Sequence, residues 1–142
     1  MQTWTFPALI KKDGEGGYCV TFPDIPGCIT GGFSLEEARL NAEDALEEMI
    51  LFFMAHGMDI PAPRAAESGE EAIALDPVTA SRAILARAMK AGKVSNVALA
   101  AKLGKTEGAI RRLTDGSSAV KLDTVLQAMR AVGINAALAV VA

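Results

Sequence analysis

Residues 18–46, YCVTFPDIPGCITGGFSLEEARLNAEDAL, decide the fold of the first half of the chain. Tyr18–Phe22 alternates in polarity and predicts a strand. Two prolines and a glycine within residues 23–28 exclude a regular element there and predict a shaped loop. Ile29–Phe33 is a second short strand. Ser34, followed three residues later by Glu37, has the spacing of a capping box and predicts the start of a helix.

The helix predicted after this cap runs from residue 34 to about His56, where Gly57 is a natural stop. One face repeats apolar side chains at helical spacing: Leu35, Ala38, Ala42, Ala45, Leu46, Met49, Ile50 and Phe53. The opposite face is charged and mostly acidic: Glu36, Arg39, Glu43, Asp44, Glu47 and Glu48. Phe33 and Ala38 occupy the positions of a hydrophobic staple.

Further strands are predicted on both sides of this stretch. Trp4–Ile10 reads as a strand, and the polar, glycine-rich residues 11–17 turn it into a hairpin with the strand at 18–22. Pro61-Ala62-Pro63 is a rigid connector, and Ala72–Leu75 reads as a returning strand. Three strands, one long helix and a fourth strand predict an α+β domain over residues 1–76, a small antiparallel sheet with one helix across it.

The second half predicts an all-α domain over residues 77–142. Asp76 followed by Pro77 is a helix start, and further helices are predicted at 96–103, 107–114 and 122–132. Two short helices joined at Gly104 have a helix-turn-helix pattern, in which Ala100 is small because the next helix crosses it. The apolar tail 134–142 fits a strand that pairs with a second subunit or an extension of the last helix; we favour the strand.

Charge divides the chain at the same place. Residues 1–76 carry four basic and fourteen acidic groups, a net charge of −10, whereas residues 77–142 carry ten basic and three acidic groups, a net charge of +7. This asymmetry predicts a basic surface for nucleic acid and an acidic surface for a different partner.

Composition makes several classes of protein improbable. No apolar run exceeds seven residues, which argues against a membrane span, and the start of the chain lacks the pattern of a secretory signal, which favours the cytoplasm. Cys19 and Cys28 are not spaced as zinc ligands and are predicted to be core thiols. His56 is predicted to cap its helix or lie on the surface. We expect no metal, no cofactor and no catalytic residues.

The stretch 18–46 resembles the N-terminal domain of HicB-like antitoxins, and the resemblance spans residues 4–76. Its most specific part is the FPDIPGC loop followed by the SLEEA helix start. The resemblance implies a partial ribonuclease-H-like fold that is not catalytic and that binds and inhibits HicA, a small toxin that cleaves messenger RNA. The candidate toxin contacts are Phe22, Asp24, Ile25, Glu43 and Glu47.

Residues 77–133 resemble the Cro/repressor type of helix-turn-helix. That resemblance implies that the helix at 107–114 enters the major groove of double-stranded DNA with its N-terminal residues on base edges. The candidate DNA contacts are Lys102, Lys105, Thr106, Glu107, Gly108, Arg111, Arg112, Ser117 and Lys121. Gly108 departs from the family, which usually has a polar side chain there.

Together these patterns predict a two-domain antitoxin and autorepressor that binds a palindromic operator as a homodimer or higher oligomer. One alternative is a repressor whose first domain senses a small ligand. Another is a nuclease built on the ribonuclease-H-like core. That chemistry needs several convergent carboxylates, whereas Asp24 stands alone in its loop and is predicted to cap the turn.

Overall fold

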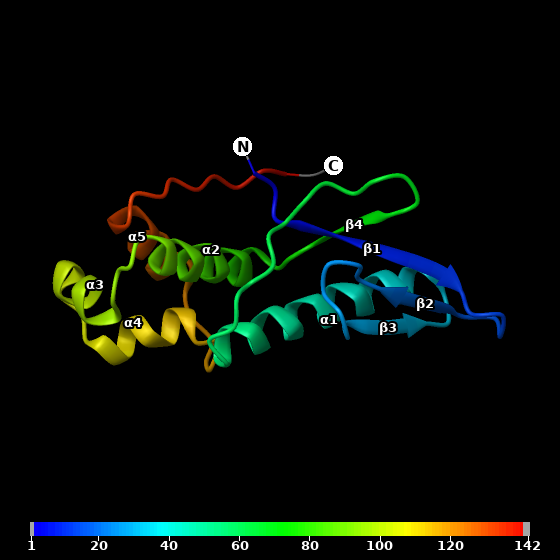
Figure 1. Ribbon diagram of the computed structural model, residues 1–142, viewed down its shortest axis with the longest axis horizontal. Coiled ribbons are helices and arrows are strands. Elements are labelled where there is room, and N and C mark those ends of the chain that lie inside the picture. Colours follow the sequence, from blue (N-terminus) through cyan, green and yellow to red (C-terminus); the bar gives the residue numbers. More distant parts are fainter. Residues whose placement is uncertain (1, 141–142) are drawn as a thin grey trace.

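The computed structural model describes residues 2–140, and its elements lie where the sequence predicts them (Figure 1). In chain order they are β1 Thr5–Lys12, β2 Tyr18–Thr21, β3 Ile29–Gly32, α1 Leu35–Ala55, β4 Glu71–Ala74, α2 Pro77–Ala91, α3 Asn96–Leu103, α4 Glu107–Thr114 and α5 Leu122–Ala131. The predicted α+β part followed by helices is confirmed.

The strands form one antiparallel sheet in the order β3-β2-β1-β4. The long strand β1 pairs with a different strand along each half of its length: residues 5–8 pair with β4 and residues 9–12 pair with β2. Pro7 therefore lies where β1 is paired on one edge, a position at which the missing N–H of proline is tolerated in a sheet.

Two glycines allow β3 to lie close to its neighbours. A Cβ on Gly31 would stand 2.4 Å from the carbonyl oxygen of Tyr18, and one on Gly32 would stand 2.6 Å from the backbone nitrogen of Ala38. Any side chain at either position would displace β3 from β2 or from the first turn of α1.

The predicted capping box of α1 is present. The Ser34 hydroxyl accepts from the Glu37 N–H at 3.1 Å, and the Glu37 carboxylate accepts from the Phe33 N–H at 3.4 Å. The predicted staple is wrong, because Phe33 is 85% exposed. Gly32 packs against Ala38 in its place, so the chain enters α1 with Phe33 outside the core.

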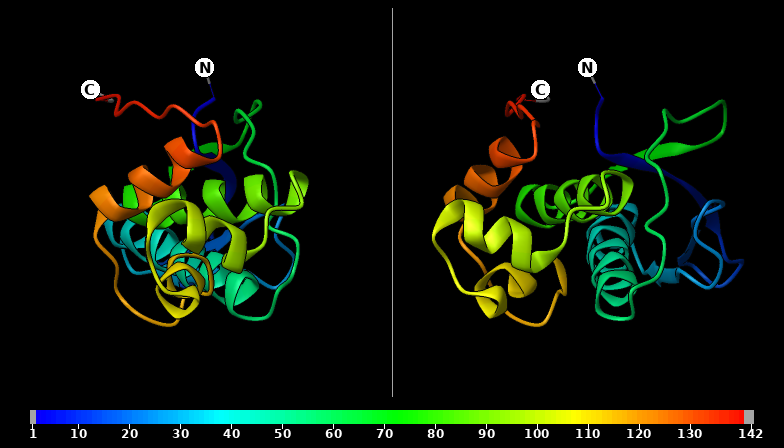
Figure 2. Two further views of the ribbon diagram at one scale, coloured as in Figure 1. Left: turned by 90° about the vertical axis from the view of Figure 1, so that its left-hand side faces the viewer. Right: turned by 60° about the vertical axis from the view of Figure 1, so that its left-hand side comes forward.

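The sheet and α1 enclose the first core, in which Phe6, Val20, Leu46 and Ile50 are fully buried. The helix α2 belongs to two cores. Its first half places Ala80 and Ala83 against α1 and the sheet. Its second half packs Leu85 and Met89 with α3, α4 and α5. Figure 2 shows α2 between α1 and the remaining helices.

Two smaller predictions, on Cys19 and Asp24, are wrong, and of the two interpretations of the tail the favoured one, a strand that pairs with a second subunit, stays a prediction. Cys19 is exposed, because successive residues of β2 face opposite sides of the sheet and Val20 takes the buried side; Cys28 is buried as predicted. Asp24 does not cap its own turn but pairs with Arg64. The tail is no extension of α5, since residues 134–140 are not helical. Within the described chain this segment pairs with no strand, and residues 141–142 of the predicted tail strand lie outside the described residues.

Arg64 joins two loops of the first half. Its guanidinium donates to both carboxylate oxygens of Asp24, at 2.7 and 3.1 Å, and to both of Glu70, at 2.8 and 2.9 Å. The hydrogen bonds from Arg64 lower the pKa of Glu70 to about 2. The cluster therefore holds the loop at 23–28 against the connector between α1 and β4.

We expect Arg64→Met to lower the melting temperature at pH 7, and the difference from the wild-type chain to shrink in acid. The folded-state pKa of Glu70 is depressed, so the stabilisation is complete above its ordinary value near 4.5 and is lost as pH falls toward about 2. Thermal unfolding between pH 7 and pH 2.5 measures the effect. Arg39→Met, which breaks an exposed ion pair with Glu71, is the control. A difference that stays constant across this range would contradict the assignment to Glu70.

Candidate nucleic-acid interface

The helices α3 and α4 are joined by a closed turn of three residues, Gly104 to Thr106. Gly104 has φ 65°, the left-handed conformation that glycine adopts without steric cost. The Lys105 N–H donates to the Ala100 carbonyl at 2.9 Å, and the Thr106 hydroxyl caps α4 by accepting from the Ala109 N–H at 3.1 Å. Ala100 is buried in the second core, together with Ile110 and Leu113 of α4.

The C-terminal end of α4 is held by a buried arginine on α2. Arg82 is 5% exposed, and its guanidinium donates to the carbonyl oxygens of Leu113 and Arg112, both at 3.0 Å. A cation at this end of a helix is favoured by the helix dipole. Burial lowers the pKa of Arg82, while the charge of Asp115 raises it.

Sequence reasoning missed Arg82, although a pattern was present. Arg82 precedes Leu85 and Met89 by three and seven residues, so it lies on the buried face of α2. A charged residue on an apolar face predicts an internal partner. The partners here are backbone carbonyls about thirty residues away, which no local pattern identifies.

The structure gathers the central DNA candidates on one side of α4. Lys105, Thr106, Arg111 and Arg112 are exposed, and Glu107 and Gly108 are half-buried among them. The other three candidates lie elsewhere: Lys102 donates to the Ala131 carbonyl at 2.7 Å, Ser117 bonds Asp115 in the turn after α4, and Lys121 is exposed just before α5.

The toxin candidates are more dispersed. Phe22 and Ile25 are buried in the first core, and Asp24 belongs to the Arg64 cluster. Glu47 accepts from the Thr79 hydroxyl at 2.9 Å, which links α1 to α2. Of the five candidates, Glu43 alone is classed as exposed.

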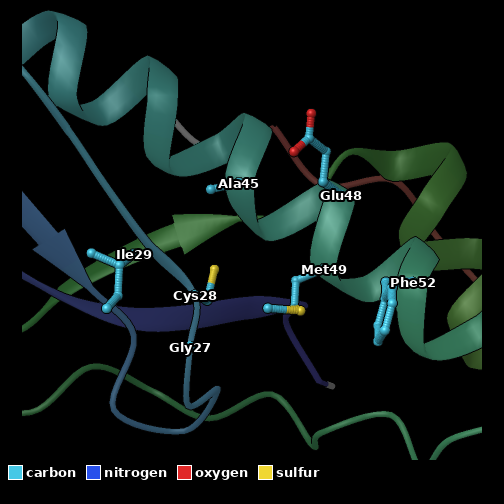
Figure 3. Close-up of a pocket in the computed structure, with 7 residues that line it drawn as sticks. All are labelled: Gly27, Cys28, Ile29, Ala45, Glu48, Met49 and Phe52. Carbon is cyan, nitrogen blue, oxygen red and sulfur yellow. The ribbon is translucent and has the colours of Figure 1, made fainter.

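A hollow of about 360 Å³ lies beside α1, and no pattern in the sequence indicates it. Gly27 and Cys28 of the preceding loop and Ile29 of β3 line it on one side, and Ala45, Glu48, Met49 and Phe52 of α1 line it on the other (Figure 3). Ile29 is 64% and Phe52 47% exposed, so its rim is apolar. Burial, together with the charge of Glu48, raises the pKa of the Cys28 thiol.

Within residues 2–140, no three histidine, cysteine, aspartate or glutamate side chains are grouped as a metal ion would require. Among the helices of the same residues, none has both the length and the apolar composition of a membrane span.

Comparisons with known proteins cover most of the chain. The family model described as the HicB-like antitoxin of bacterial toxin–antitoxin systems matches residues 5–84. The chain is 34% identical to Antitoxin HicB 2 of Photorhabdus laumondii over 90% of both chains. It is 32% identical to Antitoxin HicB of Escherichia coli K12 over 96% of this chain and 99% of the relative. Antitoxin HicB of Pseudomonas fluorescens is 29% identical over 89% of this chain and 87% of its own.

Replacing Arg82 by methionine should cost about 2–3 kcal/mol of the free energy of unfolding, because it leaves two carbonyl acceptors at the end of α4 without their donors. Urea unfolding followed by circular dichroism measures this. Arg130→Met, at an exposed position on α5, should change the stability by less than about 0.5 kcal/mol. Equal stability of the two variants would mean that Arg82 does not hold α4.

Proposed function

This chain belongs to the HicB-like antitoxin family, and from that premise we propose that it binds and blocks a HicA-like, mRNA-cleaving toxin and represses its own operon. It is an antitoxin of a toxin–antitoxin system, a family whose members are not enzymes. The toxin and operator activities are the two parts of the proposal, and each is supported by a different half of the chain.

The operator activity is supported above all by the way α4 is held at both ends while its basic side chains stay exposed. The closed turn at Gly104 fixes its N-terminal end and Arg82 fixes its C-terminal end, while Lys105, Arg111 and Arg112 remain exposed. A rigid, basic helix at the second position of a helix-turn-helix is the element that enters the major groove in this class of protein. The net charge of +7 in residues 77–142 adds attraction to phosphate.

The toxin activity is supported by the charge of α1. Glu43, Asp44 and Glu48 are exposed on this helix, and Glu48 also lines the hollow with its apolar rim. An acidic surface with an exposed apolar centre suits a protein that must itself be basic to bind RNA, because opposite fields accelerate association. We propose that the toxin covers Glu43 and the hollow, and so is inhibited by steric occlusion.

The domain and subunit arrangement is also part of the proposal. We divide the chain into a toxin-binding domain, residues 1–76, and a DNA-binding domain, residues 77–142. A single small helical domain makes few contacts, so specific binding needs two copies on half-sites about 34 Å apart. The exposed apolar residues Leu138 and Val140 of the tail are candidates for the contact between those copies.

The toxin activity is tested by co-expressing the chain with the small reading frame beside its gene. We expect a co-purifying complex and rescue of growth. The double variant Glu43→Lys/Glu48→Lys should weaken both, because it reverses two charges on the proposed surface. Glu15→Lys/Glu67→Lys, which reverses two exposed charges on loops, is the matched control. If the neighbouring product is neither toxic nor bound, the toxin activity is wrong.

The operator activity is tested with duplex DNA from upstream of the gene, by fluorescence anisotropy at several salt concentrations. Lys105→Ala and Lys121→Ala should each weaken binding to all sequences alike and reduce the salt slope by about one, as expected for the loss of one phosphate contact. Arg130→Ala should leave the slope unchanged. A wild-type chain that does not bind this DNA at all would exclude the operator activity and leave the toxin activity standing.

A further inference from the structure

Gly108 is a glycine that the fold does not require. It lies in the first turn of α4, where glycine costs about 1 kcal/mol of helix stability relative to alanine. Its φ is not positive, unlike that of Gly104. A Cβ at this position would meet nothing closer than 3.6 Å, which is ordinary contact, whereas a Cβ on Gly31 or Gly32 would collide with backbone.

A Cβ at position 108 would contact the guanidinium groups of two arginines. Its nearest neighbours would be Nη2 of Arg111 at 3.6 Å and Nη1 of Arg112 at 3.7 Å. Both arginines lie on the following turn and extend back along the helix over the bare Cα of Gly108. Two like charges thus converge on the one glycine of α4.

The two arginines differ in their partners. Arg111 donates to the Glu107 carboxylate at 2.8 Å, a pair between residues four apart on one turn of α4. Within the described residues, the Arg112 side chain makes no hydrogen bond or ion pair, and only its carbonyl is used, by Arg82. The backbone of Arg112 is therefore held by Arg82, while within the described residues none of its guanidinium N–H groups is used in a hydrogen bond.

An arginine with free donors on a helix that enters the major groove has a specific chemical match. Its two parallel N–H groups bond the N7 and O6 acceptors of guanine, the commonest specific contact between proteins and DNA. A neighbouring side chain at position 108 would stand between the guanidinium and the base edge. Glycine leaves that space open.

We propose that Arg112, lying over Gly108, reads a guanine in each half of the operator, and that Arg111 is held beside it by Glu107 as a supporting charge. This inference rests on the proposed operator activity. It adds the identity of one base, the side chain that reads it and the reason for the glycine.

The experiment is selection from a library of randomised DNA duplexes with the full-length chain and five variants. The wild-type chain should enrich a two-fold site with an invariant guanine in each half. On that site Arg112→Ala should bind about 5- to 150-fold more weakly and accept any base at the guanine position. Arg112→Lys, which keeps the charge without the planar pair of donors, should bind this site more weakly than the wild-type chain and show a reduced preference for guanine.

The glycine is tested in the same selection. Gly108→Ala should keep the guanine preference, because its Cβ only reaches ordinary contact, whereas Gly108→Leu should lose it by displacing the guanidinium. Circular dichroism establishes that every variant keeps its helices. Replacing the selected guanine by 7-deazaguanine, which lacks the N7 acceptor, should weaken the wild-type chain and leave Arg112→Ala unaffected.

Other results would overturn the inference in distinguishable ways. Uniform weakening of Arg112→Ala on all sequences, with a lower salt slope, would make Arg112 a phosphate contact. Loss of the guanine from the Arg111→Ala selection alone would assign the reading to the other arginine. A wild-type chain that enriches no site would refute the operator activity itself, and this inference with it.

Discussion

The arrangement of this molecule depends on the buried guanidinium of Arg82. A buried charge is costly unless it is hydrogen-bonded, and Arg82 donates from Nε and Nη2 to the carbonyl oxygens of Leu113 and Arg112 at the C-terminal end of α4. No carboxylate lies within ion-pair distance of it in the described chain, so the dipole of a helix of eight residues supplies the negative end. The contact fixes the position of α4 while leaving its outward side free.

Because Arg82 lies on α2, the two halves of the chain are packed as neighbours. Ala80 and Ala83 place the first part of α2 in the core beneath the sheet, and the Thr79 hydroxyl bonds Glu47 on α1. On the other side, Gly116, just after α4, lies so close to α1 that a Cβ would stand 3.0 Å from the Leu51 carbonyl oxygen. The acidic helix and the basic helix thus both pack against α2 or its immediate neighbours, so the two surfaces belong to one packed body.

Local patterns were sufficient to predict the elements of the fold. The capping residues Ser34, Asp76, Ser95 and Thr106 and the stop at Gly104 all act as the sequence predicts, because each concerns residues within one turn. What could not be predicted are contacts between distant residues, such as Arg64 with Asp24, forty positions apart, and Arg82 with Leu113. The candidate DNA site lies together because its central residues share α4. The predicted toxin residues are dispersed, because Phe22 and Ile25 face the core and only Glu43, on α1, is exposed.

The charge asymmetry has a consequence that the small net charge of −3 conceals. One half of the molecule carries a net charge of −10 and the other a net charge of +7. Salt screens both fields at distances beyond a few Debye lengths, but a partner within about 10 Å of one half experiences mainly the charge of that half. On the proposed function, DNA would be attracted to the helical half and repelled by the sheet half, which would orient the encounter before any base is contacted. A basic partner experiences the reverse. In the proposed function, opposite charges on two parts of one packed body would therefore direct the two kinds of partner to different surfaces, with α2 packed between them.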